Sequence, residues 1–189
     1  TVEVGSGHSQ AVVGYDLLRE SLFIQDPGEP HYREVNTDEF LQNYRLNGPR
    51  GLVLVPAEQE DRLVSFTLPD AEPYEHYHRL NKALSVYQRD EAQAALEDLE
   101  RLAPQHRLTL LAHVTMASFD GNEVARLHAI ERLLEVYPDD PRLLHWHYNA
   151  LRTLGTRAER LRLLRGVVTQ KICPPAFYMH LATELLDDA

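Results

Sequence analysis

The feature that most constrains this sequence is a repeat of 34 residues in its second part. Pro104, Pro138 and Pro174 each follow a helical segment, at separations of 34 and then 36 residues. The apolar positions keep the register of 34: Leu96 aligns with Ile130 and Leu164, Leu99 with Leu133 and Val167, Ala83 with Ala117, Leu151 and Leu185, and Leu80 with Val114, Tyr148 and Ala182. Four aligned sets favour a stack of equivalent helical hairpins. The alternative is a non-repetitive helical bundle whose spacing arises by chance.

A helix-turn-helix unit of this length that ends near a proline resembles the tetratricopeptide repeat. The resemblance covers the chain from Tyr74 onward and predicts hairpins over 74–103, 107–137 and 141–171, followed by a final helix over 176–186. The small-residue position of the second helix holds Ala92 in the first unit, but Arg126 and Arg160 in the next two. The tryptophan and glycine typical of the repeat are missing from their places. The resemblance therefore rests on period, proline and apolar register.

Stacked hairpins form a concave face, which in tetratricopeptide proteins is lined by the first helix of each pair. The groove positions of that family select Tyr74, Tyr77 and Asn81 in the first hairpin, and Arg142, His145, Asn149 and Arg152 in the third. An arginine fork matches the geometry of a carboxylate, so this face is predicted to bind a peptide carboxylate or an acidic segment. The second hairpin offers no charged residue at these positions. The alternative is a solvated helix face that happens to contain arginine.

Residues 1–69 follow a different pattern, in which short β-type runs are separated by turns. Strands are predicted over 11–15 and 21–24, and proline and glycine make 26–30 a turn. A short helix is predicted to begin at Asn36 as N-cap, with Glu39 completing a capping box. The apolar run 51–56 has the length of a strand, and 62–68 is predicted to be a further strand or an extended linker.

The first two predicted strands carry a histidine and an aspartate at neighbouring ends. His8 opens the first strand, which runs to Asp16, and Asp26 comes at the end of the second strand, directly before Pro27. From about Gly7 onward this arrangement resembles the C-terminal half of a papain-like cysteine peptidase of the C39 type, the bacteriocin-processing, double-glycine group. The resemblance implies that His8 is the general base and that Asp26 orients it for accepting a thiol proton. The alternative is that both are ordinary polar residues at strand ends.

The resemblance also implies a nucleophilic cysteine and an oxyanion glutamine, which in the family lie upstream of the histidine. This sequence begins seven residues before His8 and contains neither, because Cys173 lies in the helical part and Gln10 follows the histidine. Thiol-protease chemistry therefore requires a companion segment that carries the nucleophile. Half of a papain-like fold leaves one face of its sheet open, so that segment or a dimer mate is expected to cover it.

Composition excludes several other classes of function. A net charge of −10 disfavours nucleic acid and an anionic membrane surface, and no apolar run is long enough to span a membrane. The histidine pairs His76/His78 and His145/His147 are two residues apart, so on a helix they point in different directions and predict no metal site. No cofactor is predicted. The single cysteine rules out an internal disulfide and fits a reducing compartment such as the cytoplasm.

The sequence thus predicts an α+β protein in two parts. Residues 1–69 would form a partial papain-like antiparallel β subdomain, and residues 70–189 a tetratricopeptide-like helical array. The predicted function is a C-terminal fragment of a cysteine peptidase, a hydrolase only when a cysteine-bearing segment completes it, whose array binds a protein or peptide. The alternative is a non-catalytic interaction scaffold with a degenerate peptidase-like subdomain.

Overall fold

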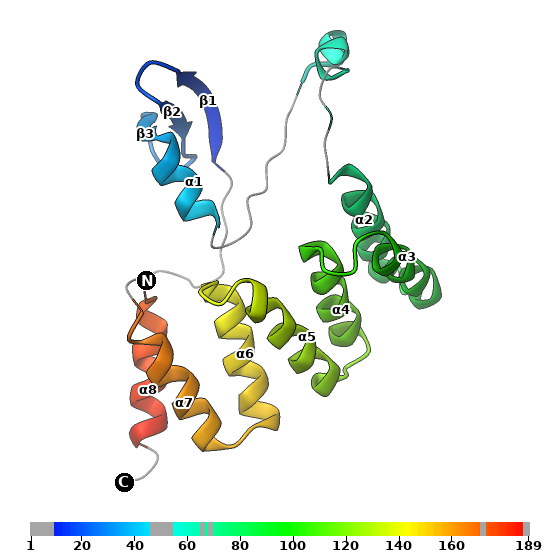
Figure 1. The fold of residues 1–189 in the computed structure, drawn as a ribbon, viewed down its shortest axis with the longest axis vertical. Helices are drawn as coiled ribbons and strands as arrows, with labels where there is room; N and C mark the ends of the chain where they lie inside the picture. The colour runs from blue at the N-terminus through cyan, green and yellow to red at the C-terminus, as the bar shows by residue number, and fades with distance from the viewer. Residues whose placement is uncertain (1–9, 46–54, 65–66, 68–69, 171–172, 187–189) are drawn as a thin grey trace.

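The computed structural model describes residues 10–45, 55–64, 67, 70–170 and 173–186. A small antiparallel sheet comes first in the chain, and a series of helical hairpins follows it (Figure 1). The predicted α+β class is confirmed. No helix in the described part of the chain is both long and apolar enough to span a membrane.

Among the described residues the sheet has three antiparallel strands in the order β1-β2-β3: Ala11–Asp16, Ser21–Gln25 and Arg33–Asn36. Ala11 pairs with Gln25, and a bulge at Val13 shifts the register of β1 against β2. The strands predicted over 11–15 and 21–24 are confirmed. β3 has a single apolar residue, Val35, so its sequence carries no strand pattern.

Helix α1 (Thr37–Arg45) begins at the predicted N-cap. The side-chain oxygen of Asn36 accepts hydrogen bonds from the backbone N–H groups of Asp38 (3.0 Å) and Glu39 (3.2 Å). These bonds satisfy two of the donors that a helix leaves open at its first turn. The helix packs beside β3, and the sheet buries Ile24 of β2.

Of the two alternatives predicted for 62–68, the strand is wrong at residues 62–64, and the rest of the range lies mostly outside the described residues. Residues Ala57–Leu63 form a 3-10 helix, η1, which includes the beginning of the predicted strand, and Val64 lies exposed after it. Pro56 precedes η1, and three acidic residues within it disfavour a strand. The other predicted strand, 51–56, lies mostly outside the described residues, and Val55 and Pro56 are not in a strand.

In the described part of the chain seven helices follow η1: α2 (Ala71–Ser85), α3 (Arg89–Leu102), α4 (Arg107–Phe119), α5 (Glu123–Val136), α6 (Pro141–Leu154), α7 (Arg157–Val167) and α8 (Pro175–Leu186). Helices α2 and α3, α4 and α5, and α6 and α7 pack as consecutive pairs (Figure 1). Each pair also contacts the next one, because α3 packs on α4, α5 on α6 and α7 on α8. The predicted hairpins are confirmed to within a few residues at their ends.

The register of 34 residues predicts the core of the array correctly. Leu99, Leu133 and Val167 of the second helices are all buried, and so are Leu96, Ile130 and Leu164 one turn earlier. The aligned residues of the first helices in the three hairpins are buried as well. In α8 the aligned Ala182 and Leu185 are exposed instead.

Short turns separate the helices and cap the ones that follow. Thr156 and Glu159 form a reciprocal capping box at the start of α7. Gly121 adopts a φ of +65° between α4 and α5, and the adjacent Asn122 side chain caps α5 by accepting from the backbone N–H of Ala125. Glycine takes this left-handed conformation without the steric cost that a Cβ brings.

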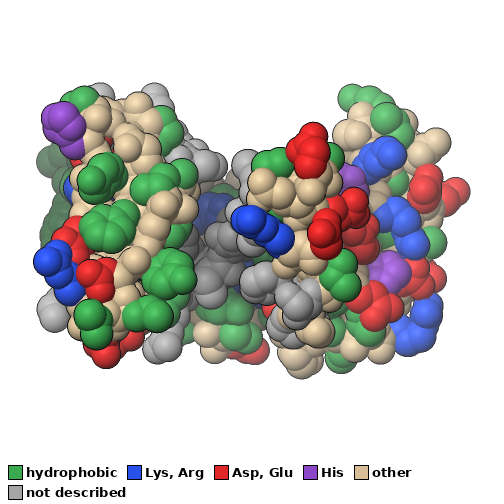
Figure 2. Space-filling view, turned by 90° about the horizontal axis from the view of Figure 1, so that it is seen from above, with side chains coloured by type: hydrophobic (Ala, Val, Ile, Leu, Met, Phe, Trp, Pro, Cys, Tyr) green, Lys and Arg blue, Asp and Glu red, His purple; other side chains and the backbone are tan. Residues whose placement is uncertain are grey.

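The small sheet leaves much apolar surface exposed. Val13 is 59% exposed and Tyr15 of the same strand 68% exposed, and Leu17 and Leu18 in the following turn are more exposed still. Figure 2 shows hydrophobic side chains gathered over the sheet subdomain, at the left of that view. A patch of this kind in a folded protein commonly marks an interaction surface.

Candidate functional site

Asp26 lies at the end of β2, beside the start of β1. One of its carboxylate oxygens accepts a hydrogen bond from the Gln10 side chain (2.7 Å), and the other accepts from the backbone N–H of Gly28 (2.9 Å). The pairing of Ala11 with Gln25 explains this contact, because the residue before β1 and the residue after β2 meet at one edge. His8 lies outside the described residues, so its pairing with Asp26 stays a prediction.

Cys173 lies between α7 and α8 and is half-buried. Its Sγ donates to the carbonyl oxygen of Pro174 (3.5 Å), and burial raises the pKa of the thiol. A nucleophilic cysteine needs the opposite change, since the thiolate is the reactive form. The raised pKa therefore does not favour a nucleophilic role for Cys173.

The predicted groove residues of the first hairpin lie along α2. Tyr74 is exposed, whereas Tyr77 packs against the apolar clusters of the first and the second hairpin. Asn81 donates through its side-chain amide to the carbonyl oxygen of Tyr77 (2.7 Å). Two of the three residues therefore make contacts within the array, and Tyr74 is the one that a partner reaches most easily.

The predicted groove residues of the third hairpin lie along α6. The guanidinium of Arg142 lies over the ring of Trp146, 5.3 Å from its centroid, and the ring of His145 meets that of Phe177 edge-on. Asn149 is half-buried, while Arg152 is exposed and makes no hydrogen bond or ion pair with the described residues. The array places α4 and α5 between α2 and α6, so the two sets of groove residues form separate patches (Figure 1).

Arg152 lines a cavity at the α6–α8 end of the array. The cavity has a volume of about 310 Å³, and its lining comes from all three of the last helices: Tyr148, Arg152, Arg160, His180, Thr183 and Glu184. Polar side chains dominate this lining. The charged ones are two arginines and one glutamate, so the walls carry an excess of one positive charge when the histidine is neutral.

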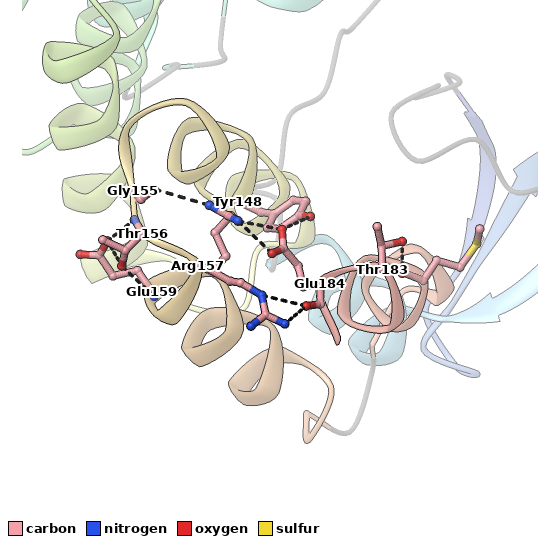
Figure 3. Close-up of polar contacts among 9 residues, drawn as sticks. Tyr148, Gly155, Thr156, Arg157, Glu159, Thr183 and Glu184 are labelled. Atoms are coloured by element: carbon pink, nitrogen blue, oxygen red, sulfur yellow. Dashed lines mark hydrogen bonds and ion pairs between the residues drawn. The ribbon is translucent and has the colours of Figure 1, made fainter. Parts of the chain in front are cut away.

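Glu184 is the centre of the polar contacts that hold α8 (Figure 3). Its buried carboxylate accepts from Arg160 Nε (2.7 Å) and Nη2 (3.0 Å) in a fork-shaped pair, and from the hydroxyl of Tyr148 (3.1 Å). Its backbone carbonyl accepts from Arg157 Nε (3.0 Å). The Arg160 guanidinium holds the pKa of this carboxyl below its ordinary value, and burial raises the pKa of Tyr148.

Sequence reasoning selected Arg152 but not Glu184, Arg160 or Tyr148 as members of a site. The register of 34 places Arg160 where the first hairpin has the fully buried Ala92. An arginine at a position that is normally small and buried calls for a buried carboxylate partner. Glu184 is that partner. It lies on the buried side of α8, seven residues, or about two helical turns, after the buried Phe177, and this spacing in the sequence indicates that the two residues share one side of the helix.

Two histidine rings lie against the same end of the array. The rings of His145 and His180 are 5.5 Å apart between centroids, and His180 also stacks on Tyr148 at 4.6 Å. Burial, with His145 and Arg152 nearby, lowers the pKa of His180, so its neutral form is favoured. Within the ranges that the structure describes, no three His, Cys, Asp or Glu side chains gather as metal ligands would.

Comparisons with known proteins do not place the chain in a family. The chain matches no protein-family model, and a search of curated proteins finds no similar sequence.

Proposed function

We propose that the helical array is a protein-interaction module, and that the α6–α8 end of it binds a carboxylate of an acidic peptide or protein segment. The observation that carries the proposal is the exposed Arg152, which lines a polar cavity without an ion-pair partner among the described residues. Arg160, the other arginine in the lining, is already paired with Glu184. Arg152 is thus the lining cation that a ligand carboxylate can reach.

The surroundings of Arg152 fit an anionic ligand. The cavity is large enough for one acidic side chain or a chain terminus, and the hydroxyl of Thr183 adds a polar group to the lining. Arginine binds carboxylates in a two-pronged geometry that also fixes the orientation of the ligand. The chain as a whole has a net charge of −10. The positive excess of the cavity wall is therefore a local exception, and it attracts an acidic ligand to this part of the surface.

Substitution of Arg152 by methionine is expected to weaken binding of a fluorescein-labelled acidic hexapeptide about ten-fold, since a charge-assisted hydrogen bond contributes about 1.5 kcal/mol. Fluorescence anisotropy measures the affinity. The matched control is Arg165→Met, which removes another exposed arginine, from α7. A peptide with an amidated C-terminus separates recognition of the chain terminus from recognition of acidic side chains. Equal affinities for the two variants would rule out Arg152 as the binding residue.

A second candidate function is favoured by the contact between Gln10 and Asp26. Gln10 binds Asp26 where β1 begins, and His8 is two residues before Gln10 in the sequence, which supports the expected pairing of His8 with Asp26. We infer that the sheet belongs to a C39-like cysteine peptidase, in which Asp26 orients His8 and a companion segment supplies the thiol. The exposed apolar surface around Val13 and Tyr15 would receive that segment.

This second function predicts a measurable link between the two residues. A carboxylate beside an imidazole stabilises its protonated form, so Asp26→Asn is expected to move the titration midpoint of the His8 ring to lower pH. Ring signals followed by NMR across a pH series give the midpoint, with Asp16→Asn at the other end of β1 as control. A His8 midpoint that is unchanged by Asp26→Asn would leave the non-catalytic scaffold as the better description.

A further inference from the structure

The lining of the α6–α8 cavity includes a side chain that can change its charge near neutral pH, His180. Its ring stacks on Tyr148 at 4.6 Å between centroids and lies 5.5 Å from the ring of His145. Arg152 and His180 line the same cavity of about 310 Å³, so a ligand carboxylate that Arg152 binds there also comes close to His180. The charge of this histidine therefore affects how firmly the ligand is held.

The surroundings of His180 in the protein favour its neutral ring. Burial lowers the pKa of His180 most, and the nearby His145 and Arg152 lower it further. The Nε2 atom of His180 is buried and has no hydrogen-bond partner among the described residues. A neutral imidazole can leave one nitrogen without a proton, whereas an imidazolium carries a proton on both. Before a ligand binds, Arg152 therefore provides positive charge to the cavity and His180 does not.

The titratable and charged groups around His180 come from all three helices at this end of the array. They are His145, Tyr148 and Arg152 on α6, Arg160 on α7, and Glu184 on α8 itself. Glu184 favours the protonated ring, but its carboxylate is already paired with Arg160 and also accepts from the Tyr148 hydroxyl (Figure 3). The acid in the lining is thus largely neutralised, and a ligand can supply the carboxylate charge that His180 needs.

A carboxylate bound to Arg152 reverses the balance at His180. It neutralises one of the positive charges that disfavour the imidazolium, and its own negative charge favours a proton on the ring. Binding of the ligand therefore raises the pKa of His180 above its value in the free protein. Because coupling between two bound species is reciprocal, protonation of His180 strengthens binding of the ligand by the same factor.

We propose that the α6–α8 cavity binds an acidic peptide together with one proton, which His180 takes up, so that the affinity for the peptide increases as the pH falls. This inference rests on the carboxylate-binding function proposed for Arg152 and adds regulation by pH to it. The increase spans the interval between the pKa of His180 in the complex and its lower pKa in the free protein. Arg152 provides a permanent positive charge, and His180 provides a second one only in the complex or in acid.

Isothermal titration calorimetry of the whole chain with an unlabelled acidic hexapeptide is expected to give an affinity about five-fold higher at about pH 5.5 than at about pH 7.5. The peptide carboxylates stay ionised over this range, so the change reports on the protein. Two buffers with different heats of protonation measure the proton uptake itself. His180→Gln is expected to bind with the same affinity at both pH values. The matched control, His128→Gln at an exposed position of α5, keeps the full dependence on pH.

NMR of the unsubstituted chain tests the same inference without relying on the fold of a variant. The titration midpoint of the His180 ring is expected to move to higher pH when the hexapeptide saturates the cavity. Binding that requires Arg152 but has the same affinity at both pH values overturns this inference and leaves the carboxylate-binding function in place. A dependence on pH that persists in His180→Gln, or a His180 midpoint that the peptide does not move, also overturns it. A chain that binds no acidic peptide at either pH overturns both.

Discussion

Replacing Glu184 by glutamine is expected to weaken the packing of α8 on the array and to lower the free energy of unfolding by about 3 kcal/mol, because it removes the buried carboxylate from the ion pair with Arg160. Glutamine keeps the shape of the side chain and one of its acceptors. It removes the fork-shaped ion pair, whose two bonds measure 2.7 and 3.0 Å. The loss should concentrate at this end of the array, since helical hairpins contact their nearest neighbours and terminal ones open first.

Hydrogen exchange and urea denaturation measure this effect. In Glu184→Gln, amide protection should fall in α8 and α7, while α2 to α5 keep theirs. The matched control is Glu135→Gln, the same chemical change at an exposed position of α5. A double variant with methionine at both 160 and 184 replaces the ion pair by apolar side chains and should recover much of the loss. Identical urea midpoints for Glu184→Gln and Glu135→Gln would contradict a structural role for the pair.

Lowering the pH should remove the stabilisation by the Glu184–Arg160 ion pair from the unsubstituted protein. Arg160 lowers the pKa of Glu184 below its ordinary value of 4.5. A carboxyl group with a lowered pKa stabilises the folded state above its unfolded pKa, and this stabilisation is lost as the pH falls through the folded pKa. The difference in stability between Glu184→Gln and the unsubstituted chain should therefore be complete at neutral pH and shrink below about pH 4.5.

The helical array could be predicted from the sequence because its core obeys a period. Leu99, Leu133 and Val167 pack in the same way in three successive hairpins, so the same hydrophobic pattern occurs three times in the sequence. The sheet was predictable where β-branched and aromatic residues cluster, as in β1 and β2. In η1 the period is absent and acidic residues prevail, and the strand alternative for 62–68 is wrong at its first residues.

The α6–α8 site could be predicted in part. Arg152 follows from its place on the groove side of a first helix, but the Glu184 cluster joins side chains that lie 24 and 36 residues apart. Hydrogen bonds between single polar side chains on different helices have no period, so a pattern search does not find them. The contact of Arg142 with Trp146 shows the converse: a residue expected to face a ligand packs within its own helix.

Substitution of Asp140 by alanine is expected to lower the free energy of unfolding by about 4 kcal/mol, more than Glu184→Gln does. The reason is that the Asp140 side chain both caps α6 and neutralises a buried arginine. One carboxylate oxygen accepts from the backbone N–H groups of Arg142 (2.9 Å) and Leu143 (3.3 Å). The other accepts from Arg107 Nη2 (3.4 Å), and the Asp140 side chain is completely buried.

Asp140→Asn separates the two contributions. Asparagine is an equally good N-cap, so it keeps the bonds to the start of α6 and loses the negative charge beside Arg107. Arg107 is 9% exposed, and its guanidinium lies over the ring of Tyr137, so it cannot turn into water without opening this packing. We therefore expect Asp140→Asn to lower the free energy of unfolding by about 3 kcal/mol, and Asp140→Ala to lower it by about 1 kcal/mol more.

The position of Asp140 distinguishes this effect from that of Glu184. Arg107 opens α4 and Asp140 precedes α6, so their pair joins the second hairpin to the third in the interior of the stack. Loss of the pair should lower the urea midpoint reported by every helix, rather than release one end. Asp139→Asn, the same substitution at the exposed neighbouring residue, is the control. If Asp140→Asn and Asp139→Asn unfold at the same urea concentration, Arg107 does not depend on this carboxylate, and the second and third hairpins are held together by apolar packing alone.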